Sequence, residues 1–275
     1  MARDTEPMLR RLALGVTLGG SFVWMAMWPS PAAAYRRTTI DDIPDGTPLF
    51  WGRRSLPFRD VSTTLPGVEV LDAQAALRRS LSTWSRADSC TDLQLEYRGA
   101  ARTDRTNLSG GAPDLENRIV FRASAWPPEV GPQTLAVTTL VYRRSTGEIL
   151  DADIDVNAVN HSWSALGEPT GSDDVENTLT HELGHAIGLA HTDVPEATMF
   201  ANADLSETLK RDLAADDLEA VCAVYPAPRQ LRGVCSAQAP GRDGAPAALA
   251  FLLCAASCLR RRRASRHVLG ASRGC

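Results

Sequence analysis

The sequence predicts an α+β fold in which a twisted, mixed β-sheet is backed by two helices. Segments that alternate apolar and polar residues, or that are rich in β-branched and aromatic residues, predict strands. They lie at residues 49–58, 93–97, 118–123, 134–142 and 149–156. Residues 70–87 and 175–187 instead repeat apolar side chains at spacings of three and four, which is typical of amphipathic helices. A strand, a helix, more strands and a late helix favour a sheet covered by helices.

The ends of the predicted helices carry local signals. Asp173, with Glu176 three residues later, predicts a capping box at the start of the second helix. Trp84, near the end of the first helix, is expected in the core. Residues 213–225 predict a last helix that closes the domain.

Composition limits the class of protein. The chain has 275 residues, of which 44% are hydrophobic and 23% charged, as in a globular protein of one or two domains. The formal net charge is −4. A nucleic-acid-binding protein would carry a basic surface, so we expect no nucleic-acid partner.

Residues 1–34 predict a secretory signal peptide. Arg3, Arg10 and Arg11 form a basic start, an apolar run follows, and small residues precede Tyr35 at a cleavage site after Ala34. An uncleaved membrane anchor is the alternative. Either way we expect an exported protein, in a compartment where cysteines form disulfides.

A short polar segment, residues 35–47, precedes the expected domain at residues 48–228. It contains Asp41, Asp42 and Asp45 but no cysteine. These acids are expected on the surface. The alternative, an aspartate that occupies the open position of a metal, is not favoured by any pattern.

The strongest motif is H-E-x-x-H-x-x-G-x-x-H at residues 181–191. On a helix, His181 and His185 share one face and can bind one ion. Gly188 can adopt the positive φ that ends a helix, so that His191 returns as a third ligand. Three imidazoles leave one position of Zn²⁺ open for water, which is the arrangement of a catalytic site. Glu182 lies beside that position without being a ligand, so we expect it to be the general base.

These residues resemble the motif of the metzincin clan of zinc endopeptidases, and residues 191–200 resemble the matrixins in particular. Met199 corresponds to the methionine of the tight turn beneath the metal. The resemblance covers about residues 48–226 and implies a five-stranded sheet, two long helices and a small C-terminal subdomain that ends in a helix. Ala201 stands where astacins and serralysins carry a tyrosine, which argues against a mechanism that uses that tyrosine.

The resemblance also implies a substrate strand. In matrixins an edge strand before the site pairs with an extended peptide, and Leu135, Ala136 and Val137 are the candidates here. A position inside the sheet is the alternative.

Asp151, Asp153 and Asp155 are candidates for Ca²⁺, which favours oxygen ligands, and solvated acids are the alternative. The histidines of the family's second zinc are missing, so we expect one zinc.

Two cysteines, Cys90 and Cys222, lie within the expected domain. A disulfide between them would close a loop of about 130 residues and stabilise the fold by roughly 3–5 kcal/mol. Asp216 and Asp217 resemble the paired aspartates that tie the last matrixin helix to the methionine turn and to the mature N-terminus. Acids on the surface of the helix are the alternative.

The C-terminal tail predicts a membrane-directed sorting signal. Residues 229–246 are a linker rich in Pro, Gly and Ala that contains Cys235, and residues 247–275 combine a short apolar run with an arginine cluster. The apolar run is shorter than the roughly 20 residues of a spanning helix. The tail resembles the MYXO-CTERM sorting signal, which is removed at the cell surface. A simple C-terminal anchor is the alternative.

Together these features predict an exported, monomeric zinc endopeptidase of the cell surface, outer membrane or extracellular space that acts on proteins or peptides. Two alternatives remain open at this point. One is a zinc-binding surface module without proteolytic activity, and the other is a zinc hydrolase of non-peptide amides.

Overall fold

The computed structural model describes residues 34–61, 65–87, 90–110 and 113–228. The expected signal peptide, apart from Ala34, and the expected linker and tail from residue 229 onward lie outside these described residues.

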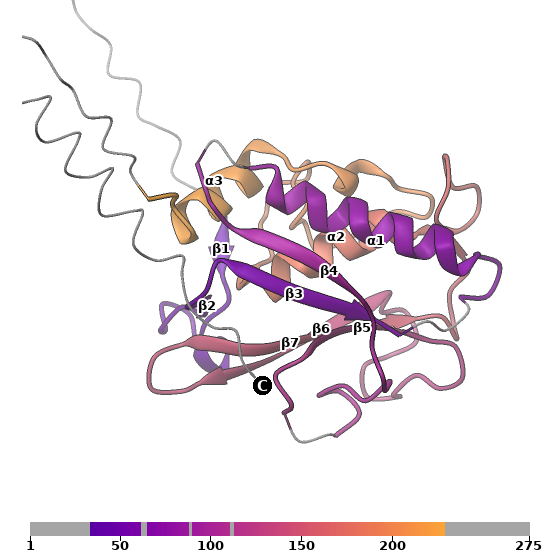
Figure 1. Cartoon of the computed structure of the whole chain (residues 1–275). Helices are drawn as coiled ribbons and strands as arrows, with labels where there is room; N and C mark the ends of the chain where they lie inside the picture. Colours follow the sequence, from indigo (N-terminus) through magenta and orange to yellow (C-terminus); the bar gives the residue numbers. More distant parts are fainter. Residues whose placement is uncertain (1–33, 62–64, 88–89, 111–112, 229–275) are drawn as a thin grey trace, which may run out of the picture. The chain divides into compact units, whose positions relative to one another are not determined.

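The main sheet is mixed and contains six strands among the described residues. They are β2 (Phe50–Trp51), β3 (Ser55–Asp60), β4 (Gln94–Ala100), β5 (Asn117–Arg122), β6 (Ala136–Arg143) and β7 (Glu148–Asn157). Strands β4, β3, β5 and β7 run parallel in that order, β2 adds to the start of β7, and β6 pairs antiparallel with β7 (Figure 1). Strand β6 has β7 as its sheet partner in this part of the chain, which leaves its other side open.

Two short sheets fix the segments around the main sheet. Strand β1 (Arg36–Arg37) pairs antiparallel with β10 (Leu189–Ala190), and β8 (Trp163–Ser164) pairs parallel with β9 (Asp173–Asp174). Two short 3₁₀ segments, η1 (Ile40–Asp42) and η2 (Leu209–Arg211), complete the connections.

Helices α1 (Val70–Ser85) and α2 (Val175–Ala186) lie side by side over one face of the sheet (Figure 1). The indole of Trp84 is fully buried between them and donates from Nε1 to the Thr180 carbonyl at 2.8 Å. Helix α3 (Ala215–Val224) follows η2. The core therefore lies between the sheet and these helices, and every residue of α2 except His185 is buried.

The mixed α/β architecture agrees with the prediction, but three details differ. The segment 49–58 forms two strands, because the chain leaves β7 at Gly52, where a Cβ atom would lie 2.6 Å from Glu148 Oε1. This raises the number of strands from five to six. The capping prediction was wrong: Asp174 is the N-cap of α2 and accepts from the Asn177 amide at 2.7 Å. Glu176 instead pairs with Arg79 on α1. The first and last helices are each slightly shorter than expected.

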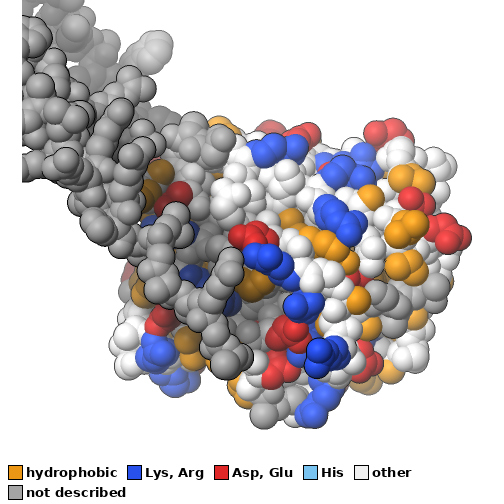
Figure 2. All heavy atoms as spheres, viewed as in Figure 1, with side chains coloured by type: hydrophobic (Ala, Val, Ile, Leu, Met, Phe, Trp, Pro, Cys, Tyr) orange, Lys and Arg blue, Asp and Glu red, His pale blue; other side chains and the backbone are white. Residues whose placement is uncertain are grey.

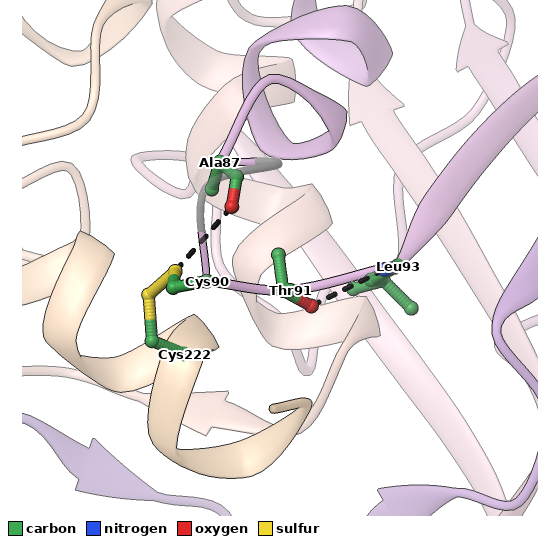
Figure 3. Close-up of a disulfide and its surroundings, with 5 residues drawn as sticks. All are labelled: Ala87, Cys90, Thr91, Leu93 and Cys222. Carbon is green, nitrogen blue, oxygen red and sulfur yellow. Dashed lines mark hydrogen bonds between the residues drawn. A yellow bond between two sulfur atoms is a disulfide. The ribbon is translucent and has the colours of Figure 1, made fainter. Parts of the chain in front are cut away.

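Cys90 and Cys222 are joined by a disulfide (Figure 3). Their Cα atoms are 5.3 Å apart and 132 residues apart in sequence. The Ala227 amide also donates to the Cys90 carbonyl at 2.8 Å, so the chain after α3 runs beside the chain after α1. The disulfide thus joins the segment just after α1 to helix α3, far along the chain.

The face of the molecule in Figure 2 carries acidic and basic side chains side by side. Over β3 and β4, Arg54 pairs with Asp92 and Arg59 with Glu116. No helix in the described ranges is long and apolar enough to cross a membrane.

Candidate metal centre

Helix α2 and the turn after it bring three histidines together. His181 and His185 lie one turn apart on α2 and share a face. Gly188, at φ +88°, then reverses the chain into β10, and a Cβ atom there would lie 2.8 Å from the Leu49 carbonyl oxygen. A side chain at this position would be both strained and too close to its neighbour. The reversal places His191 opposite the helix.

The three rings point Nε2 atoms at one another. His191 Nε2 lies 3.2 Å from that of His181 and 3.1 Å from that of His185. His181 Nδ1 lies 2.6 Å from the Thr198 carbonyl oxygen, and His185 Nδ1 lies 2.8 Å from the Leu189 carbonyl oxygen. A carbonyl only accepts, so these Nδ1 atoms carry the protons and the Nε2 atoms keep their lone pairs. Burial lowers the pKa of all three rings, which favours the neutral forms.

Lone pairs that face one another repel unless a cation lies between them. The three histidines are the one group of at least three potential ligand residues with converging ligand atoms, all within 4.8 Å, in the described part of the chain. Backbone hydrogen bonds fix the ring orientations of His181 and His185, as in metal sites whose ligands are held by surrounding groups. The donor set therefore fits a zinc ion.

Glu182 is buried beside this cluster, with only 6% of its surface exposed. Burial raises the pKa of its carboxyl to about 7, and the hydrogen bond from Thr138 opposes that shift. The Thr138 hydroxyl, on β6, donates to Glu182 Oε2 at 2.6 Å. Thr138 is not among the site residues predicted from the sequence. Its only signal was its place directly after the candidate substrate residues 135–137.

Met199 lies beneath the histidines with 2% of its surface exposed. A Cβ atom on Gly184 would lie 2.2 Å from Met199 Sδ, so α2 needs a glycine where the turn packs against it. Asp217 on α3 accepts from the Thr198 amide at 2.7 Å and from the Met199 amide at 3.0 Å. Asp217 thereby holds the turn whose Thr198 carbonyl orients His181. Its neighbour Asp216 has a buried Oδ2 without a hydrogen-bond partner among the described residues.

A cleft of about 680 Å³ runs past the histidines and Glu182. Leu135, the β6 residues 136–138 and Leu140 line one side of it. The open edge of β6 therefore borders the cleft. The other lining residues include Asn177 and Thr178 of α2, residues 201–203 after the methionine turn, Lys210, and Thr38 and Asp42 of the N-terminal segment.

The candidate calcium residues lie elsewhere in the fold. Asp151, Asp153 and Asp155 are at most 1% exposed, so the alternative of solvated acids is wrong. Asp153 accepts from the backbone amides of Asn107 and Arg118, and Asp155 accepts from Arg122 Nε at 2.6 Å. Their oxygens do not converge as the histidine nitrogens do. Calcium binding stays a prediction, with Asp151 Oδ1 and Asp155 Oδ2 as buried oxygens that lack a partner in the described part of the chain.

The fold and this site define the class of protein. A mixed α/β domain carries an H-E-x-x-H-x-x-G-x-x-H segment whose three imidazoles converge and whose glutamate borders an open cleft, as in zinc metallopeptidases. Comparison with known families places the chain within that class. Residues 123–226 match the model of the peptidase M10 family, described as matrixin.

Individual proteins similar to this chain are consistent with the match to the matrixin model. Human matrix metalloproteinase-16 is 25% identical over 182 residues, which are 66% of this chain and 28% of that protein. Human neutrophil collagenase is 31% identical over 176 residues, 64% of this chain and 33% of its own. The metalloendoproteinase 2-MMP of Arabidopsis thaliana is 34% identical over 93 residues, 32% of this chain and 22% of its own. The chain spans a third or less of the length of these relatives.

Proposed function

We propose that the protein is a zinc metalloendopeptidase that hydrolyses peptide bonds in proteins or peptides. The observation that carries this proposal is the convergence of the His181, His185 and His191 Nε2 atoms beside the buried carboxylate of Glu182. The matrixin family supports it, since zinc peptidase chemistry is what that family implies.

The roles of the chain's own residues follow from their positions. His181, His185 and His191 would hold the ion through Nε2. Bound zinc supplies Lewis-acid polarisation of a carbonyl and lowers the pKa of a bound water. Glu182 accepts the proton of the attacking water and delivers it to the leaving amine. Thr138 holds the carboxylate of Glu182 in place by its hydroxyl hydrogen bond.

The open edge of β6 is proposed to bind the substrate backbone. Leu135, Ala136 and Val137 line the cleft, and β6 has no sheet neighbour on that side among the described strands. An extended peptide can add there as a further strand, whose backbone hydrogen bonds depend little on side-chain identity.

We also propose that the enzyme works as a monomer outside the cytoplasm, exported and then held at the cell surface, on the outer membrane or in the surroundings. The Cys90–Cys222 disulfide supports this location, because structural disulfides form and persist in oxidising compartments. The signal peptide and the sorting tail proposed from the sequence agree with it.

The test compares the full-length zinc-loaded protein with its Glu182→Gln variant on casein and on a peptide library. Loss of the base is expected to lower kcat/KM by at least about 100-fold, since a general base contributes about 10²–10⁴-fold. Bound zinc, measured by metal analysis, should stay near one ion per chain in both proteins. Chelation should abolish cleavage, and zinc should restore it. Equal rates for the two proteins would refute the proposed mechanism.

A further inference from the structure

We propose that the N-terminal segment 35–42 forms a wall of the substrate cleft, and that the carboxylate of Asp42 selects peptides with a basic side chain. The inference rests on the proposed function and names a substrate preference for it. Thr38 and Asp42 line the same cleft as Glu182 and the three histidines.

The wall is anchored directly beside the metal centre. Strand β1 pairs with β10, the strand that ends just before His191. The Thr38 amide donates to the Gly188 carbonyl at 3.0 Å, and the Thr38 hydroxyl donates to the Leu189 carbonyl at 3.1 Å. The Leu49 amide closes the loop by donating to the Thr38 carbonyl at 2.8 Å. The segment therefore has a fixed position relative to His191.

Two neighbouring aspartates in this wall have different surroundings. Asp41 accepts from Arg144 Nη1 at 2.8 Å and from the Tyr142 hydroxyl at 3.0 Å, so its charge is paired. These contacts also place the wall at the Tyr142 end of β6. Asp42 is exposed, and its carboxylate has no hydrogen bond or ion pair among the described residues.

Asp42 stands out among the charged groups that line the cleft. Glu182 is hydrogen-bonded to Thr138, and Lys210 is buried in an ion pair with Glu207. The histidines favour their neutral forms. Asp42 thus leaves an unpaired negative charge at one end of the cleft. A lysine or arginine side chain of a substrate that reaches this end would meet that charge.

The direction in which a peptide pairs with β6 determines at which position of the peptide a basic side chain is preferred. A peptide that pairs antiparallel to β6 runs from the Leu140 end toward the Leu135 end. Its residues before the scissile bond then lie near the wall, and its residues after the bond lie toward Asn177 and Asn202. The preference is therefore expected before the scissile bond. Solvent-exposed pairs are weak, so its size should be about 2- to 5-fold in kcat/KM.

The experiment uses the full-length zinc-loaded protein and peptide pairs that differ only by Lys or Gln at one position before the scissile bond. The ratio of kcat/KM for Lys over Gln should be about 2 to 5 at low salt and should fall toward 1 as salt screens the charge. In Asp42→Asn the ratio should be close to 1 at every salt concentration. Asparagine suits the test because it tolerates the positive φ of 53° found at Asp42.

Asp45→Asn is the matched control. Asp45 lies in the same turn at φ 58°, is exposed, and does not line the cleft. This variant should keep the ratio of the parent protein. An unchanged ratio in Asp42→Asn, or no preference in the parent protein, would overturn the inference while Glu182-dependent cleavage still supports the proposed function. Absence of zinc-dependent cleavage would overturn both.

Discussion

The histidine cluster, defined as His181, His185 and His191, and the aspartate ladder of β7, defined as Asp151, Asp153 and Asp155, are two groups of potential metal ligands. In the cluster, His191 Nε2 lies 3.2 Å from that of His181 and 3.1 Å from that of His185, and the other ring nitrogens of His181 and His185 bind backbone carbonyls. In the ladder, four of the six carboxylate oxygens accept a hydrogen bond, from the Asn107 and Arg118 backbone amides, Asn107 Nδ2 and Arg122 Nε. The cluster thus has nitrogen lone pairs that face one another and can bind a cation, whereas most carboxylate oxygens of the ladder are hydrogen-bonded within the protein.

Backbone geometry explains the difference. Residues four apart on a helix lie about 6 Å apart on one face, and the turn at Gly188 adds a third side chain from the opposite direction. Alternate residues of a strand lie about 6–7 Å apart along a line, so that the first and last aspartates are about 13 Å apart. Residue type suggests a metal site in both regions, but only convergence from different directions can surround one ion.

The largest effect is expected when the cluster is broken. His185→Ala should lower bound zinc from about one ion to less than about 0.1 per chain and should abolish measurable cleavage, because two imidazoles cannot hold a catalytic zinc tightly. Metal analysis after gel filtration and a peptide assay measure both quantities. Asp151→Asn is the matched change in the ladder and should keep its zinc. Loss of zinc from that variant as well would show that the two regions are not independent.

Removal of the disulfide should lower the stability of the whole domain without changing how much metal it binds. The Cys90→Ser, Cys222→Ser double variant should lower the free energy of unfolding by about 4 kcal/mol, because the bond closes a long loop of the unfolded chain. Neither cysteine touches the cluster or the ladder, so zinc stoichiometry at 25 °C should stay unchanged. Urea unfolding and metal analysis give the two values. A variant that stays folded but loses zinc would contradict this separation.

A smaller effect is expected at Asp217, which supports the cluster from α3. Asp217→Asn leaves a backbone amide of Thr198 or Met199 without its acceptor, so the free energy of unfolding should fall by about 2–3 kcal/mol. Zinc affinity should also fall, because the Thr198 carbonyl orients His181. Glu219→Gln, at an exposed position of α3, is the control and should change stability by less than about 0.5 kcal/mol. If the two variants changed stability and zinc affinity equally, Asp217 would have no positioning role.

The sequence predicts the mixed α/β fold and the residues of the candidate cluster well because both depend on local spacing. Four-residue spacing on α2, and the glycine that ends it, determine where two histidines point and where the chain turns. The amphipathic pattern of α1 and the position of Trp84 follow in the same way from periodicity.

Other features depend on contacts between residues far apart in the sequence. Thr138 reaches Glu182 across 44 residues, and Asp41 reaches Arg144 across 103. Solvent exposure stayed open as the alternative for the three aspartates, because nothing in their alternation reveals that residues 106, 107, 118 and 122 bind them. The cap of α2 was misplaced by one residue, since Asp173 and Asp174 are equally good caps. Asp173 is instead bound by His161, at 3.0 Å.

The last predicted effect is a pH dependence of opposite sign in the two regions. Burial raises the pKa of Asp153 to about 7, above the roughly 3.9 of an unfolded chain. The folded state then binds this proton more tightly, so the free energy of unfolding should fall as pH rises from about 4 to 7. The histidines have lowered pKa values, so their share of the stability is instead lost as pH falls through about 6.5.

Asp153→Asn should make the fall in stability between pH 4 and 7 shallower, because an amide does not titrate in this range while the raised pKa values of Glu182, Asp151 and Asp155 remain. The variant is expected to be less stable overall, since one of the two backbone amides at Asp153 loses its acceptor, so the slope with pH is the quantity to compare. Urea unfolding of the parent protein and the variant at pH 4.5, 6 and 7.5 measures that slope. Parallel curves for the two proteins would mean that Asp153 is ionised throughout, held by the Asn107 and Arg118 amides against the cost of burial. Asp153 would then behave as a carboxylate whose two oxygens are both satisfied within the protein, which would sharpen the contrast with the histidine cluster.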